Sequence, residues 1–142
     1  MLKNKHMTDC LFCKIVAGAI PAHKIYEDDR ILAFLDIGPV STGHTLIVPK
    51  THAENLAAGS VEDACALMTA IHDLAPKIVQ AVGAAGYNLG MNHGEVAGQD
   101  VFHTHLHIMP RKEGEVRAFV KTHPSQEELK DVAEKIRSTL AE

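Results

Sequence analysis

The sequence lacks the features that would direct this chain to a membrane or a nucleic acid. No apolar run approaches the roughly 20 residues that a bilayer-spanning helix needs, and the first ten residues lack the apolar core of a signal peptide. Lys and Arg form no run or stripe and the net charge is −4, so the electrostatic footprint of a nucleic-acid groove is missing. We therefore expect a cytoplasmic protein with neither a membrane nor a nucleic acid as its partner.

Cysteine is also scarce, and its spacing is informative. The chain has three cysteines, and the first two are separated by two residues, as Cys10-Leu-Phe-Cys13. In a cytoplasmic protein this spacing indicates metal binding or redox chemistry rather than a disulfide framework. Cys65 falls in a helical apolar pattern and is predicted to be a core residue. A Walker-type motif is absent, which excludes a P-loop nucleotide site.

The 142 residues are enough for one domain with its own hydrophobic core. We assign residues 9–142 to this domain and residues 1–8 to an N-terminal extension, in which His6-Met7 is consistent with a cloning remnant ahead of a natural start. Apolar residues with a helical period predict a long helix over 61–82, which Pro76 should kink or divide.

Shorter segments of the chain alternate between apolar runs and turn residues. Because hairpins join most of the predicted strands and one long helix interrupts them, the fold class is α+β, with an antiparallel sheet of about five strands. The predicted strands lie at 23–27, 30–36, 44–49, 87–92 and 102–109, and the remaining helices lie at 10–17 and 125–140.

Histidine is concentrated in one short segment, "HTHLH" at 103–107. Side chains in a strand alternate between two faces, so His103, His105 and His107 should share one face, with the residues between them directed to the other. Three imidazoles in register could bind a metal, perform catalysis or simply form the polar surface of an amphipathic strand. Thr, Lys and Glu are more usual on such a surface, so the pattern favours a functional site.

The segment before these histidines, "NHGEVAGQD" at 92–100, is predicted to be a loop. Gly94 and Gly98 let the backbone approach a ligand closely, and Asn92 and Gln99 can donate hydrogen bonds. Such donors beside imidazoles suit a phosphate ester, because a neutral imidazole can attack phosphorus while the donors stabilise charge on the oxygens.

The stretch "QDVFHTHLHIMPR" resembles the signature of the histidine triad (HIT) superfamily, in which three histidines alternate with apolar residues; Thr104 is a mild departure. The resemblance continues through "CLFCKIVAGAIPAHKIYEDDRILAFLDIGPVSTGHTLIVPKTH" and covers about residues 9–111, in the order and spacing of the HINT-like branch. It implies a HIT-like fold, in which one long helix and a C-terminal helix accompany the antiparallel sheet, and it implies a homodimer.

The resemblance also implies roles for individual residues. His105 corresponds to the nucleophile and His107 to a histidine that contacts the α-phosphate, while His44 either supports His105 or is a purely structural histidine. Asp36 corresponds to a carboxylate that accepts hydrogen bonds from the ribose hydroxyls, and Asp100 stands where many members have serine. Further implied nucleotide contacts are Leu11, Phe12, Ile15, Phe34 and Ile37, which could equally be core residues, together with Asn92, Gly98 and Gln99 near the phosphate.

A structural zinc site is implied in the same way. In zinc-bearing members of the superfamily, the ligands that complete a Cys₂His₂ set with Cys10 and Cys13 correspond to His52 and His103. Four protein ligands leave no open position, so this zinc would be structural and no catalytic metal is required. The alternative, a redox pair, would favour a thioredoxin-like βαβ context, which the sequence does not show.

The predicted function is hydrolysis or transfer at the α-phosphate of a purine nucleotide. The substrate would be a nucleoside phosphoramidate or a related AMP derivative, and the intermediate a nucleotidyl group on His105. Two alternatives remain: a dinucleoside polyphosphate hydrolase, as in a sister branch, and a nucleotide-binding regulatory module with little activity. The intact set of Asp36, Gln99, His105 and His107 argues against the regulatory module.

Overall fold

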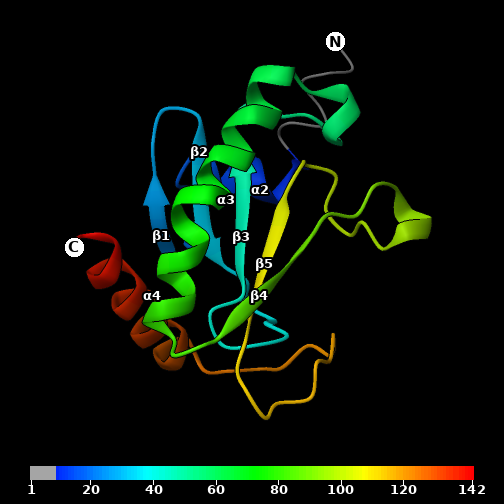
Figure 1. The fold of residues 1–142 in the computed structure, drawn as a ribbon. Helices are drawn as coiled ribbons and strands as arrows, with labels where there is room; N and C mark the ends of the chain where they lie inside the picture. The colour runs from blue at the N-terminus through cyan, green and yellow to red at the C-terminus, as the bar shows by residue number, and fades with distance from the viewer. Residues whose placement is uncertain (1–8) are drawn as a thin grey trace.

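The computed structural model describes residues 9–142 and contains one five-stranded antiparallel sheet (Figure 1). The strands follow the order β1-β2-β3-β5-β4 across the sheet, so the predicted α+β class is confirmed. The predicted extension at 1–8 lies outside the described residues. The strands are β1 (Lys24–Glu27), β2 (Ile31–Leu35), β3 (Thr45–Pro49), β4 (Gly86–Gly90) and β5 (Leu106–Arg111), and the helices are α2 (Leu11–Val16), α3 (Val61–Ala81), α4 (Gln126–Leu140) and the 3-10 turns η1 (Leu56–Ala58) and η2 (Glu95–Ala97).

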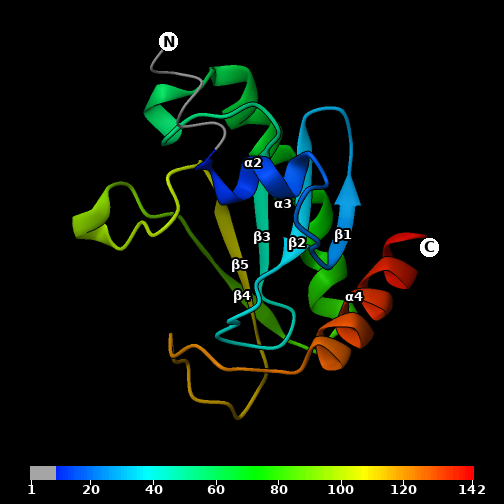
Figure 2. The same ribbon diagram turned by 180° about the vertical axis from the view of Figure 1, so that it is seen from behind.

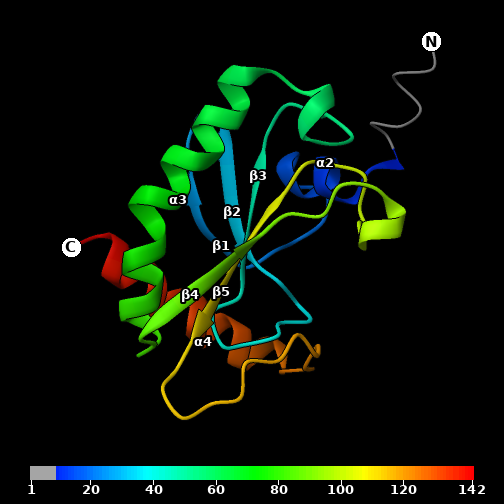
Figure 3. The same cartoon turned by 45° about the vertical axis from the view of Figure 1, so that its right-hand side comes forward.

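Helices cover the two faces of the sheet unequally. The long helix α3 and the C-terminal helix α4 pack on one face, and the short helix α2 crosses the opposite face, as Figure 2 and the oblique view of Figure 3 show. The central strands β2 and β3 are buried along their whole length. Their uninterrupted apolar runs are therefore explained by burial on both faces rather than on one.

The core is divided by the sheet into two apolar clusters. On the α3 side, Leu106 and Ile108 of β5 pack with the buried stripe of α3 and with α4. On the α2 side, Phe34 of β2 and Leu46 of β3 pack against Phe12 and its neighbours in α2. Alternation along β5 therefore directs His107 away from the α3 core.

Two details of α3 differ from the predictions. Pro76 does not divide the helix, and the carbonyl of His72, which Pro76 cannot bond, belongs to an exposed turn. Cys65 is exposed, so its prediction as a core residue is wrong. The buried stripe runs through Leu67, Ile71 and Leu74, and Cys65 lies on a different face of the helix.

The fifth strand begins later than predicted, at Leu106 rather than at residue 102. The N–H of Thr104 donates to the carbonyl of Ala53 in the loop after β3, at 2.9 Å, so this part of the chain leaves the ladder. His103 and His105 consequently precede the strand, and only His107 lies within it. Within residues 9–142, no helix is long and apolar enough to cross a membrane.

Candidate active site

A cavity of about 980 Å³ opens on the α2 side of the sheet. Its walls come from α2, the end of β2, the strands β4 and β5, and the loop that follows β4. Segments far apart in the sequence thus meet at one hollow. The residues predicted to contact a nucleotide that line it are Leu11, Phe12, Ile15, Phe34, Asp36, Ile37, Asn92, Gly98, Asp100, His105 and His107.

The side chain of Gln99 is placed differently, because it organises the loop after β4 instead of lining the cavity. Gln99 is 3% exposed. Its Oε1 accepts a bond from the Gly94 N–H at 2.8 Å, and its Nε2 donates to the Glu54 carbonyl at 2.7 Å. Asn92 also contributes to the loop, since its Nδ2 donates to the Gly98 carbonyl at 3.2 Å. A ligand would therefore contact a loop whose shape is set by hydrogen bonds of the Asn92 and Gln99 side-chain amides.

The tautomer of His105 follows from its hydrogen bond. Its Nδ1 lies 2.7 Å from the backbone carbonyl of His103, and a carbonyl can only accept. Neutral His105 must therefore carry its proton on Nδ1, which leaves a lone pair on Nε2. The ring itself is 7% exposed and lies edge-on to the Phe12 ring at 5.0 Å. His105 is thus held as an oriented nucleophile or base at the cavity wall.

His107 is oriented by a chain of two hydrogen bonds. The N–H of Val40 donates to Nδ1 of His44 at 3.1 Å, so neutral His44 carries its proton on Nε2. That Nε2 lies 2.9 Å from Nδ1 of His107, which must then accept. The proton of neutral His107 is consequently on Nε2, where it can be donated to a ligand in the cavity.

Burial keeps the hydrogen-bonded rings of His44 and His107 neutral. It is the main cause that lowers the pKa of His107 to about 4, with His105 and His44 as further contributions. Burial also lowers the pKa of His44, although the nearby carboxylate of Asp36 opposes that effect. At neutral pH both rings are therefore neutral, as the directional bonds between them require.

Asp36 lies at the end of β2 and presents its carboxylate to the cavity. Oδ1 accepts a bond from the Gly38 N–H at 2.8 Å, and Oδ2 lies 3.7 Å from Nε2 of His44. The backbone turn at Gly38 therefore fixes one carboxylate oxygen and leaves acceptor capacity for a ligand hydroxyl.

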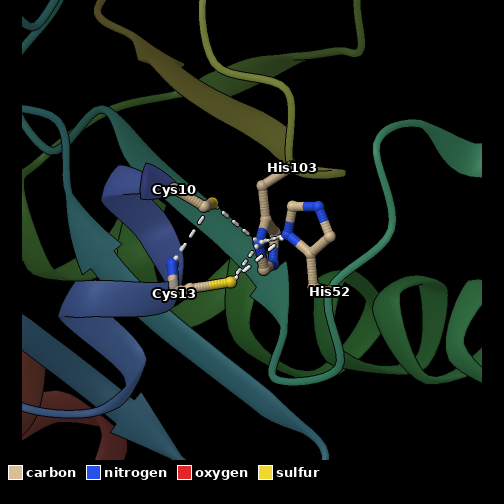
Figure 4. Close-up of side chains that lie close together, drawn as sticks. All are labelled: Cys10, Cys13, His52 and His103. Atoms are coloured by element: carbon tan, nitrogen blue, oxygen red, sulfur yellow. Dashed lines mark hydrogen bonds between the residues drawn. The ribbon is translucent and has the colours of Figure 1, made fainter. Parts of the chain in front are cut away.

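A second group of side chains lies close together at the N-terminal end of α2. Figure 4 shows Cys10, Cys13, His52 and His103 directed toward a common point. Nδ1 of His52 lies 3.2 Å from Sγ of Cys13 and 3.2 Å from Nδ1 of His103. Nδ1 of His103 lies 3.4 Å from Sγ of Cys10 and 3.5 Å from Sγ of Cys13.

These spacings match a tetrahedral zinc centre. Usual zinc–sulfur and zinc–nitrogen bond lengths place tetrahedral ligands about 3.6 Å apart for a sulfur–nitrogen pair and about 3.3 Å apart for two nitrogens. The structure places the ligand atoms close to those separations, with sulfur–nitrogen distances of 3.2, 3.4 and 3.5 Å and a nitrogen–nitrogen distance of 3.2 Å. The donor set and its geometry therefore fit zinc.

A backbone contact prepares His103 for a metal, and burial sets the protonation of His103 and Cys13. Nε2 of His103 lies 2.7 Å from the Pro49 carbonyl, so it is the donor and Nδ1 keeps the lone pair. Burial chiefly lowers the pKa of His103 to about 4, which keeps that lone pair available. Burial, assisted by Cys10, raises the pKa of Cys13 to about 12, so a bound metal would displace a thiol proton.

Asp36, His44 and His107 form another close group of potential ligands, but its hydrogen bonds disfavour a metal. Nδ1 of His44 already accepts from the backbone of Val40, so its Nε2 carries a proton where a metal would need a lone pair. This group is suited to donating a hydrogen bond instead.

Several lining residues were not predicted from the sequence, and two of them come from the irregular segment between β5 and α4. Phe119 and Lys121 line the cavity, and Nζ of Lys121 lies 3.7 Å from Oδ2 of Asp100. Arg111 holds the segment, since its Nη1 donates to the Ala118 carbonyl at 2.7 Å. The sequence here has no periodicity that could have placed them; its only signal is the apolar character around Phe119.

The chain thus combines a five-stranded antiparallel sheet with an oriented histidine at the wall of a cavity. Residues 17–114 match the HIT domain family. The chain is 44% identical over 138 residues to Protein hit of Bacillus subtilis, covering 94% of this chain and 95% of that protein. This chain belongs to the HIT domain family.

Two further relatives bear on the site. Adenosine 5'-monophosphoramidase hnt1 of Schizosaccharomyces pombe is 42% identical over 134 residues, which cover 92% of this chain and 98% of that protein. The crystal structure of a zinc-bound histidine triad family protein from Mycobacterium smegmatis superposes with a TM-score of 0.82 at 36% identity, covering 95% of each chain.

Proposed function

We propose that this protein is a nucleotide hydrolase that cleaves a nucleoside phosphoramidate, or a related AMP derivative, at the α-phosphate. The observation that carries the proposal is the bond from Nδ1 of His105 to the His103 carbonyl, which leaves Nε2 as a lone pair at the cavity wall. The hydrolase class is supported by the similarity to the phosphoramidase of S. pombe, and the finer chemistry rests on the site.

In the proposed reaction, Nε2 of His105 attacks the α-phosphorus. The nitrogen–phosphorus bond forms as the bond from phosphorus to the leaving group breaks, and the leaving group departs with the bonding pair. Water then breaks the nitrogen–phosphorus bond and releases the nucleoside monophosphate. Over both steps one water is consumed: its hydroxyl oxygen joins phosphorus and a proton goes to the leaving group.

Hydrogen-bond donors stabilise the charge that develops on the phosphate oxygens. The Nε2–H of His107, oriented through His44 and Val40, is one such donor. Backbone N–H groups of the loop that Gln99 and Asn92 shape would supply others. This assignment gives Gln99 its predicted place near the phosphate, with its side chain acting through the loop.

The remaining lining residues suit a nucleoside. Asp36 offers carboxylate oxygens to a vicinal diol, and the apolar side chains around α2 and the end of β2 offer walls to a purine. These walls are Leu11, Phe12, Ile15, Phe34 and Ile37.

A structural zinc ion is part of the proposal. Cys10, Cys13, His52 and His103 would hold it, and the four protein ligands leave no position for substrate. The fit rests on the ligand separations and on the bond from His103 to the Pro49 carbonyl. The ion would tie α2 to the segment that precedes β5, and the chemistry at phosphorus would proceed without a catalytic metal.

We also propose a homodimer. The edge strand β4 exposes Tyr87 and Leu89, at 40% and 41%, and α3 exposes Val61 and Met68, at 74% and 54%. An edge strand with apolar side chains is a surface for pairing with another chain. Sedimentation of the wild type and of Leu89→Lys tests this proposal: a dimeric wild type and a monomeric variant are expected, and a monomeric wild type would contradict it.

Hydrolysis assays test the proposed activity. Wild type, His105→Ala and the matched surface variant His72→Ala are compared on an adenosine phosphoramidate and on a dinucleoside polyphosphate. We expect preferred cleavage of the phosphoramidate, with a loss of at least about 10³-fold in His105→Ala only. Faster cleavage of the polyphosphate would favour the sister-branch activity, and binding without turnover would favour a regulatory module.

A further inference from the structure

The segment from Cys10 to Cys13 does more than supply two metal ligands. Phe12, which lies between them, is 4% exposed, and its ring meets two histidine rings edge-on. The ring centroids of Phe12 and His105 are 5.0 Å apart with an interplanar angle of 88°, and those of Phe12 and His103 are 5.9 Å apart with an angle of 73°. The same turn of chain therefore touches the proposed metal centre and the proposed nucleophile.

His103 forms a second connection between the two centres. Its ring is fully buried, with Nδ1 among the metal ligands and Nε2 on the Pro49 carbonyl. Its backbone carbonyl accepts the Nδ1–H of His105 at 2.7 Å. A shift of the His103 backbone that accompanied a movement of its ring would move this carbonyl, and the hydrogen bond that selects the tautomer of His105 would change with it.

We propose that the metal centre positions the nucleophile, through the backbone of His103 and the ring of Phe12, so that metal loading controls the chemical step more than nucleotide binding. This inference rests on the proposed function and extends it. Phe12 and His103 are then positioning residues for His105, and the purine wall is a second role for Phe12 rather than its main one.

Two nucleotide-binding groups, Asp36 and His107, are held by hydrogen bonds that do not pass through this connection, although the His107 ring lies edge-on to that of His105 at 5.0 Å. Asp36 is held by the backbone of Gly38, and His107 by His44 and Val40. Neither contact involves a residue of the metal centre. Loss of the metal should therefore disturb His105 while leaving the ribose and phosphate contacts largely in place.

The test compares metal-loaded protein, chelator-stripped protein and Phe12→Leu, with Cys65→Ser as the matched cysteine control. NMR of ¹⁵N-labelled imidazoles reports whether His105 is held with its proton on Nδ1, and equilibrium titration gives the Kd for AMP. Rapid quench with an adenosine phosphoramidate gives the rate of the first turnover. Phe12→Leu retains all four ligands, so it remains informative if the stripped protein does not fold.

We expect loaded wild type and Cys65→Ser to show one His105 tautomer. Stripped protein and Phe12→Leu should both show exchange between tautomers and a first-turnover rate lower by about tenfold or more. The stripped protein, which keeps the purine wall, should show a Kd for AMP within about threefold of wild type. An unchanged His105 tautomer in both perturbed forms would overturn the inference while leaving the proposed function intact.

The outcomes separate the inference from the activity it rests on. If loaded wild type shows no turnover, the proposed hydrolase fails, and the His105 tautomer alone still supports or overturns the coupling. If stoichiometric zinc does not bind at all, both the structural zinc and the coupling are overturned. A Kd for AMP that weakens in step with the rate in the stripped protein would also overturn control of the chemical step.

Discussion

Two groups of side chains on the α2 face of the sheet are alike in composition and differ in chemistry. One consists of Cys10, Cys13, His52 and His103, and the other of Asp36, His44 and His107. Both place imidazoles and acidic or thiol groups within 4.8 Å of one another. In one, the His103 ring donates to a carbonyl and turns a lone pair toward two cysteines. In the other, the His44 ring accepts from an N–H and turns a proton toward His107.

The difference shows that the backbone partner of an imidazole decides its role. A carbonyl partner takes the proton of one ring nitrogen and leaves a ligand or nucleophile at the other, as in His103 and His105. An amide N–H partner reverses this arrangement, as in His44. Proximity of histidines and acids alone would have assigned a metal to both groups.

The largest expected effect comes from removing two of the proposed metal ligands, which perturbs one of the two groups only. Cys10→Ser/Cys13→Ser should lose its zinc and lower the free energy of unfolding by about 4 kcal/mol, the value for a ligand at a thousand times its Kd. Metal analysis and urea unfolding measure the two effects. Cys65→Ser, an exposed cysteine, is the matched control, and a double variant with unchanged zinc content would contradict the site.

The next effect acts on the other group alone. His44→Ala removes the donor to Nδ1 of His107, so the Nε2 proton that we propose His107 donates to the phosphate is no longer fixed. We expect kcat to fall by about 10–100-fold with zinc content unchanged. Steady-state kinetics and metal analysis check this, with the exposed His72→Ala as the control. Zinc loss in His44→Ala would show that the two groups are not separate.

A smaller effect is expected at Asp36, which should bind ribose and take no part in the chemical step. Asp36→Asn weakens a charge-assisted bond to a hydroxyl, so KM should rise by about tenfold with little change in kcat. With a substrate that lacks the 2'-hydroxyl, the KM values of wild type and Asp36→Asn should differ much less. Equal penalties on both substrates would mean that Asp36 does not contact the sugar.

The smallest effect is a pH dependence of stability. The pKa of His107 is lowered to about 4 and that of His44 is lowered as well, both mainly by burial. Between pH 6.5 and 4 the unfolded chain binds these protons and the folded chain does not, so stability falls as the pH falls. Urea unfolding at pH 7 and pH 5 should show a smaller loss in His107→Gln than in wild type, and equal losses would contradict this.

Much of this arrangement could be predicted from the sequence, because alternation and spacing carry the information. The alternating histidines identify one face, and Cys10, Cys13, His52 and His103 do meet, as the resemblance implied. Phe119 and Lys121 could not be placed, since their segment follows no period and is held by tertiary bonds such as that from Arg111 to the Ala118 carbonyl. The buried side chain of Gln99 was likewise invisible, because a glutamine in a loop is ordinarily exposed.

The proposed tautomer leaves Nε2 of His105 free to attack phosphorus. The most direct test is therefore a search for a nucleotidyl group bound covalently to His105. Wild-type protein is mixed with radiolabelled adenosine phosphoramidate, quenched within one turnover, digested and analysed by mass spectrometry. The account predicts one AMP group on His105, absent from His105→Ala and decaying as AMP is released. Turnover without an adduct on His105, or an adduct on His107 instead, would contradict it.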